Sequence, residues 1–111
     1  MILITELLRN MTTKQTYEKL SELFTNTRIW QIDNYEEEFC FHLICKDFNE
    51  DYKRFLKYQT VKINFIDWKS RILWVAVQKE QLEDIGEDAI IELQKELDGE
   101  NDKAETTAVN H

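Results

Sequence analysis

The residues of this chain best suited to chemistry are Cys40 and His42, which lie two positions apart in the apolar stretch Glu38 to Lys46. A thiolate and an imidazole can act as nucleophile and general base, and both are zinc ligands. On a β-strand, side chains two apart share a face, with their roots roughly 6 to 7 Å apart. Contact between Cys40 and His42 is therefore allowed but not enforced.

A zinc site needs more donors than this pair supplies. Structural zinc takes about four ligands, and the only other histidine is His111, the last residue of the chain. Strand alternation points Cys45 away from Cys40, which argues against a disulfide between them and against a shared metal site. Because free cysteine is usually buried, we expect both thiols in the interior and expect no metal and no cofactor.

A second group of chemically capable residues is acidic: Asp33 and the run Glu36-Glu37-Glu38 surround one turn-like segment. Clustered carboxylates bind Mg²⁺ or Ca²⁺, or act as acid and base. These glutamates are consecutive, so they point in alternating directions, and they lack the Asp, Asn and Gly pattern of a calcium loop. A solvated turn is the favoured interpretation.

No catalytic signature accompanies these residues. The sequence contains no phosphate loop, no dinucleotide-binding glycine motif, and no Gly-x-Ser-x-Gly or His-Glu-x-x-His sequence. A serine or cysteine triad also lacks a second histidine within the folded part of the chain. We therefore expect a protein that is not an enzyme and has no catalytic residues.

Charge is sorted along the chain. Residues 1–79 carry 12 basic against 11 acidic side chains, whereas residues 80–111 carry 2 against 11. Residues 52–79 hold seven of the basic groups and only Asp67 on the acidic side. A basic block rich in aromatic residues thus precedes an acidic block, and these two blocks are the candidate binding surfaces.

The acidic block lies on and around the predicted last helix. Such a helix can occupy the basic groove of a partner, and Ile91 would give it an exposed apolar centre. This hypothesis makes the chain a small acidic protein-binding module: an adaptor, a chaperone, or a phage or mobile-element inhibitor of a host protein that handles nucleic acid. The competing interpretation is a solvated outer face. The expected contact residues are Glu83, Glu87, Asp88, Ile91 and Glu92.

The basic block supports an alternative function, single-stranded nucleic-acid binding regulated by the acidic C-terminal region. Single-strand binders combine aromatic rings, on which bases stack, with cations that follow the phosphates. The residues expected to do this are Lys53, Arg54, Lys57, Lys62, Trp68, Lys69 and Arg71. A core containing Phe55, Phe65 and Trp74, surrounded by solvated lysines, explains the same alternation and is the simpler interpretation.

Three helices must position these residues. Capping boxes begin at Thr12, Asp47 and Asp84, each followed three residues later by Gln or Glu. The first helix is expected to end near residues 25–27 and the second near Tyr58. The third is expected to end at Gly99, acting as a left-handed cap.

Two hairpins lie between the helices. Segments 28–33 and 38–46 form the first, and segments 59–66 and 71–78 form the second, because both pairs are rich in β-branched and aromatic residues around turn-like sequences. The expected core face of the second strand consists of Phe39, Phe41, Leu43 and Cys45.

The resulting order is α-ββ-α-ββ-α, an α+β domain over residues 1–98 whose antiparallel four-stranded sheet carries helices mainly on one face. Residues 99–111 are expected to be a disordered polar tail. No proline guards the sheet edges, which favours pairing into a homodimer. No apolar run approaches the roughly 20 residues of a membrane span, and a reduced cysteine pair is typical of cytoplasmic proteins.

Overall fold

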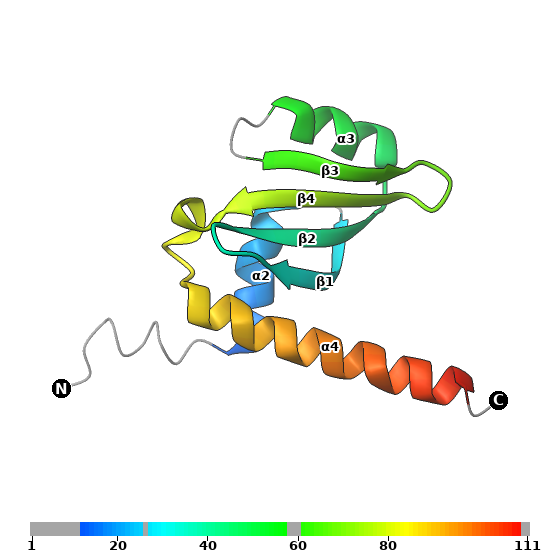
Figure 1. Cartoon of the computed structure of the whole chain (residues 1–111). Coiled ribbons are helices and arrows are strands. Elements are labelled where there is room, and N and C mark those ends of the chain that lie inside the picture. Colours follow the sequence, from blue (N-terminus) through cyan, green and yellow to red (C-terminus); the bar gives the residue numbers. More distant parts are fainter. Residues whose placement is uncertain (1–11, 26, 58–60, 110–111) are drawn as a thin grey trace.

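The computed structural model describes residues 12–25, 27–57 and 61–109, with the side chains described up to residue 102. Within these ranges, three helices and a four-stranded antiparallel sheet follow one another in the order α-ββ-α-ββ-α (Figure 1). The predicted α+β class is confirmed. None of the helices in these ranges is long and apolar enough to cross a membrane.

The element bounds agree closely with the two predicted hairpins and the first two predicted helices. The sheet order is β1-β2-β4-β3, and every pair of neighbours is antiparallel. The predicted end of the second helix and the start of the third strand fall partly at residues 58–60, outside the described residues. The elements are α2 (Thr13–Leu23), β1 (Thr27–Asn34), β2 (Glu38–Cys45), α3 (Phe48–Lys57), β3 (Val61–Asp67), β4 (Ile72–Gln78), the 3₁₀ turn η1 (Lys79–Leu82) and α4 (Glu87–Val109).

Two of the three predicted helix starts are confirmed. The Thr12 hydroxyl accepts the Gln15 N–H, and the Gln15 side chain accepts the Thr12 N–H, so a complete capping box begins α2. The Asp47 carboxylate accepts the Glu50 N–H at the start of α3. The third prediction is wrong: α4 begins at Glu87 rather than after Asp84. Gly86 has a φ of 93°, a left-handed conformation that interrupts the helical path.

The predicted end of the last helix at Gly99 is also wrong. The helix α4 continues through Gly99 to Val109, so residues 99–109, expected as a disordered tail, are helical. A glycine inside a helix costs about 1 kcal/mol relative to alanine. Beyond it, the Asn101 side-chain amide donates a hydrogen bond of 2.9 Å to the Trp30 carbonyl on β1, which helps to hold the helix to the sheet.

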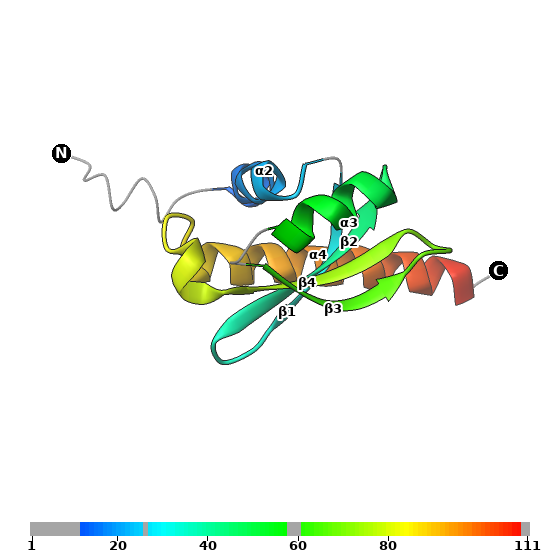
Figure 2. The same cartoon turned by 90° about the horizontal axis from the view of Figure 1, so that it is seen from above.

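The core lies between the helices and one face of the sheet, and the view from above shows the helices on that side (Figure 2). The predicted core face of β2 is confirmed, with Phe39, Phe41, Leu43 and Cys45 all buried. Its partners on β4 are Val77, Val75 and Leu73, which are buried too. The helix α4 packs along α2 and β1, and α3 packs beside β3. The helices therefore leave the opposite face of the sheet uncovered (Figures 1 and 2).

Candidate functional site on the open face of the sheet

One ring from each strand forms a row across the uncovered face, which we call the open face. The rings are Trp30 on β1, His42 on β2, Trp74 on β4 and Phe65 on β3, in the spatial order of the strands. Successive ring centroids lie 5.3, 4.4 and 4.5 Å apart. We call these four residues the aromatic row.

Two β-bulges set the outer members of the aromatic row. The β1–β2 register shifts between Ile29 and Gln31, and the β3–β4 register shifts between Ile63 and Phe65. A bulge inserts one extra residue and so resets the alternation of faces. Phe65 consequently pairs with Trp74 on the open face instead of following Ile63 into the core.

The expectation that Phe55, Phe65 and Trp74 all serve the core is therefore wrong for two of them. Phe55 is buried in the core, but Phe65 is 42% exposed. Trp74 is partly buried, and it lies between the buried core residues Leu73 and Val75 of β4. Because strand side chains alternate, the ring of Trp74 belongs to the open face.

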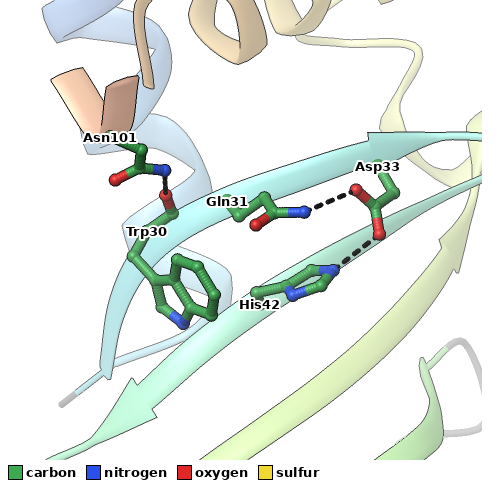
Figure 3. Close-up of polar contacts among 5 residues, drawn as sticks. All are labelled: Trp30, Gln31, Asp33, His42 and Asn101. Carbon is green, nitrogen blue, oxygen red and sulfur yellow. Dashed lines mark hydrogen bonds and ion pairs between the residues drawn. The ribbon is translucent and has the colours of Figure 1, made fainter. Parts of the chain in front are cut away.

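His42 is tied to the first strand by a polar network (Figure 3). Its Nε2 lies 2.7 Å from Asp33 Oδ2, and the Gln31 amide donates a hydrogen bond of 2.9 Å to Asp33 Oδ1. Although it is on the open face, His42 is only 3% exposed, because the rings of Trp30 and Trp74 flank it. Three buried nitrogen atoms of the aromatic row have no hydrogen-bond partner among the described residues: His42 Nδ1, Trp30 Nε1 and Trp74 Nε1.

The two cysteines lie on opposite faces of β2, as predicted, and both are free and buried. Burial is the main cause that raises the pKa of Cys40 to about 11, with the Asp33 charge adding to it, while a hydrogen bond with the Asn64 side chain opposes the rise. Burial likewise raises the pKa of Cys45 to about 12. Thiols with such pKa values are protonated near neutral pH, so the arrangement does not favour cysteine nucleophile chemistry.

The structure adds Asp33 to the predicted pair of Cys40 and His42. One donor atom from each of the three residues lies within 4.8 Å of the others. Sequence reasoning grouped Asp33 with the glutamates of the turn and missed this contact. The signal was the hairpin register, which pairs Asp33 with Cys40 across the two strands.

The acidic residues predicted to bind a protein lie on and just before α4. Glu83, Glu87, Asp88 and Glu92 are exposed. Glu87 forms an ion pair of 2.8 Å with Lys79, and Glu92 forms one of 3.4 Å with Lys95. Ile91 is only partly exposed and packs against the core, so the expectation of an exposed apolar centre on this helix is wrong.

The basic residues predicted for nucleic-acid binding do not share one face. Lys53 and Lys57 are exposed on α3, on the side of the helices, whereas Lys62 pairs with Ala76 on the open face. Arg54 forms an ion pair of 2.8 Å with the buried Asp51 and donates to the Thr25 carbonyl.

The remaining predicted residues of this group lie around the β3–β4 turn. Trp68 packs against Phe48 and Tyr52, with ring centroids 4.4 and 5.2 Å away. Lys69 and Arg71 are exposed. Within the described residues, the side chains predicted for nucleic-acid binding are thus divided between α3, the open face and the β3–β4 turn.

A groove of about 440 Å³ between α2, β1 and α4 is a further candidate. Carboxylates of Glu18, Glu96 and Glu100 line it together with the cations Lys14 and Arg28. Because charges of both signs alternate there, the groove does not select a ligand of one sign, and the open face remains the better candidate site.

Comparison of the chain with family models, with curated proteins and with solved structures gives no match. Its function must therefore be argued from the open face itself.

Proposed function

We propose that this chain is a protein-binding module that acts through the open face of its sheet. The observation that supports the proposal is the aromatic row, which the helices leave uncovered. Phe65 is 42% exposed and Ile44, beside the row on β2, is 36% exposed. Antiparallel sheets usually present polar side chains on their solvated face, whereas apolar and aromatic side chains are typical of the centre of a protein interface.

The unpaired nitrogen atoms of the aromatic row support the same proposal. A buried polar atom without a partner costs about 1 to 3 kcal/mol. The indole N–H groups of Trp30 and Trp74 lack a partner among the described residues. Because both atoms are buried, an acceptor on a bound protein would reach them only if the indole rings turn on binding, and would then recover part of that cost.

The acidic surface of α4 has less support as the main interface. The apolar residues of α4 up to Leu97, Ile91 included, pack inward, so this part of the helix offers charge without an apolar centre. Glu83 and Asp88 remain predicted contacts with a basic partner. If the chain is an inhibitor, that partner would be a host protein that handles nucleic acid. That contact is secondary in this proposal.

The occupant that we propose for the open face is a second copy of the chain, and the first reason is shape. Next to the aromatic row, the small side chains of Cys40 and Ala76 form a pair, with Asp33 on β1 and Lys62 on β3 at its two ends. Consider a two-fold axis that is parallel to the sheet and perpendicular to its strands. This axis would seat His42 and Trp74 of each copy over Cys40 and Ala76 of the other, so that large side chains meet small ones.

The second reason is charge. Cations predominate at one end of the sheet, where Arg28, Lys46 and Arg71 line one depression together with Ile44, although Asp67 of β3 lies at the same end. Carboxylates, among them Asp33 and Glu38, lie toward the other end, where β2 begins, with Lys62 of β3 nearby. The same two-fold axis reverses the strand direction, so it brings the cationic end of one copy to the acidic end of the other.

The test is to measure molar mass by sedimentation over a wide range of concentration. The wild-type chain should form dimers, and Arg28→Glu or Glu38→Arg should each weaken the dimer at least tenfold. The double variant should recover most of the affinity, because the exchanged charges again meet opposite charges. Circular dichroism reports whether each variant is folded, and Glu92→Lys on α4 is the matched control that should leave the dimer unchanged.

Two outcomes would overturn the proposal in this form. A wild-type chain that stays monomeric at every concentration excludes the second copy as the occupant. A dimer that is insensitive to both single reversals, or equally sensitive to Glu92→Lys, excludes the open face as the dimer interface.

A further inference from the structure

We propose that Asp33, Cys40 and His42 form a binding site for a divalent transition metal ion, with zinc as the best match. The three donor atoms come from adjacent strands and lie within 4.8 Å of one another. All three ligands belong to one copy of the chain, so the site does not depend on the proposed dimer.

The donor set selects the class of ion. A thiolate sulfur and an imidazole nitrogen suit zinc and its neighbours, whereas Mg²⁺ and Ca²⁺ prefer oxygen donors. The carboxylate of Asp33 supplies an oxygen, which zinc also accepts. Three protein ligands leave one position of a tetrahedral site for water or for a further ligand.

The geometry requires only a small adjustment. Two donors at about 2.1 Å from a tetrahedral zinc ion are about 3.4 Å apart. His42 Nε2 and Asp33 Oδ2 are now 2.7 Å apart, so this contact must lengthen when the ion binds. The Asp33 side chain is 31% exposed on the edge strand β1 and has room to move, whereas His42 is held between the rings of Trp30 and Trp74.

The burial of His42 is the second observation that points to a ligand. Buried polar side chains of a purely structural kind usually find partners for their polar atoms. The Nε2 atom of His42 contacts the carboxylate of Asp33, and carboxylates are themselves common metal ligands. The other ring nitrogen, Nδ1, is buried and has no partner among the described residues. The atom that would bind the ion is Nε2, which already faces the Asp33 carboxylate, whereas Nδ1 points away from the three donor atoms.

Neighbouring amides support two of the three ligands. Gln31 donates to Asp33 Oδ1, which leaves Oδ2 to face His42 and the ion. The side chain of Asn64 forms a hydrogen bond with Cys40. Groups that hold the ligands from outside in this way fix their orientation in known metal sites.

The first test uses Co²⁺ as a spectroscopic probe on the full chain under reducing conditions. The wild-type protein should bind one ion and develop the near-ultraviolet absorption of a thiolate–cobalt bond, together with the visible bands of a tetrahedral site. Zn²⁺ should abolish both signals by displacement. The variant Cys40→Ser should lose the thiolate absorption, whereas Cys45→Ser should keep it. Cys45 is the matched control, since it is a buried free cysteine on the opposite face of the same strand.

A second variant tests the carboxylate without disturbing the core. Asp33→Asn keeps the shape of the side chain, so the fold should persist by circular dichroism, while Zn²⁺ affinity should fall at least tenfold. The titration is repeated on Arg28→Glu, the variant that should weaken the dimer, and should give the wild-type affinity.

The outcomes separate the two proposals. No thiolate absorption in the folded wild-type chain, or its equal loss in Cys40→Ser and Cys45→Ser, overturns the metal site whatever the dimer does. Unchanged Zn²⁺ affinity in Asp33→Asn overturns the three-ligand site. Loss of metal binding in Arg28→Glu shows that the ligands do not come from one copy, and overturns the site as stated.

Discussion

The two faces of the sheet are made by the same four strands but present different kinds of side chain. On the core face, phenylalanine and aliphatic side chains pack together and meet the helices. On the open face, the rings of the aromatic row, two of which are positioned by bulges, lie beside Asp33 and Cys40. The core face thus serves stability, and the open face combines exposed rings with unpaired polar atoms, as a binding surface does.

The largest expected difference between the faces is in stability. Phe41 is fully buried at 0% exposure, whereas Phe65 is 42% exposed. Phe41→Ala should lower the free energy of unfolding by about 3 to 5 kcal/mol, because it leaves a cavity. Phe65→Ala should lower it by less than about 1.5 kcal/mol, because much of its ring is already in water. Urea denaturation of both variants measures the difference, and equal losses would refute this division of roles.

The second difference concerns self-association. Phe65→Ala should weaken the proposed dimer at least tenfold, because it removes one end of the aromatic row. The matched control is Leu56→Ala on α3, since Leu56 is even more exposed, at 60%, but lies on the side of the helices. Sedimentation should therefore show a weakened dimer for Phe65→Ala and a wild-type dimer for Leu56→Ala. A larger effect from Leu56→Ala would show that the dimer interface lies on the side of the helices, contrary to the proposal.

The smallest expected effect concerns a charge buried on the side of the helices. Burial raises the pKa of Asp51, and the ion pair with Arg54 opposes that rise. Because the folded state then holds the proton more firmly, Asp51 contributes stability at pH values below its unfolded pKa. This contribution is lost as the pH rises through the folded pKa.

Replacing this carboxyl with an amide should remove that dependence. The free energy of unfolding of Asp51→Asn, measured relative to that of the wild type, should therefore be higher at about pH 7 than at about pH 3. Urea denaturation at both pH values measures the change. A difference that stays constant, or that favours the wild type at the higher pH, would contradict the raised pKa.

The regular parts of the fold could be predicted because they depend on local signals. The Thr12 capping box, the two hairpins and the core face of β2 follow from neighbouring residues and from the period of two. The prediction of where α4 begins was wrong because two local signals compete. Asp84 is a suitable capping residue, but Gly86 adopts a left-handed conformation that is incompatible with a helix.

The candidate site could be predicted only in part, because it depends on pairing between strands. Cys40 and His42 were recognisable from their spacing, but Asp33 joins them only through the register of β1 with β2. The position of Phe65 depends on a bulge that no residue type announces. The continuation of α4 past Gly99 depends in part on Asn101, whose partner Trp30 lies 71 residues away in the sequence.

The hydrogen bond from Asn101 to the Trp30 carbonyl also changes what the edge strand β1 offers to another strand. An edge strand exposes backbone acceptors to which a strand of another molecule can add, and proline often prevents this. This chain has no proline, yet α4 lies along β1 and fills one of these acceptors with a side-chain amide (Figure 3). The helix thereby hinders open-ended growth of the sheet at β1, whereas the proposed dimer would form through a face and would close after two copies.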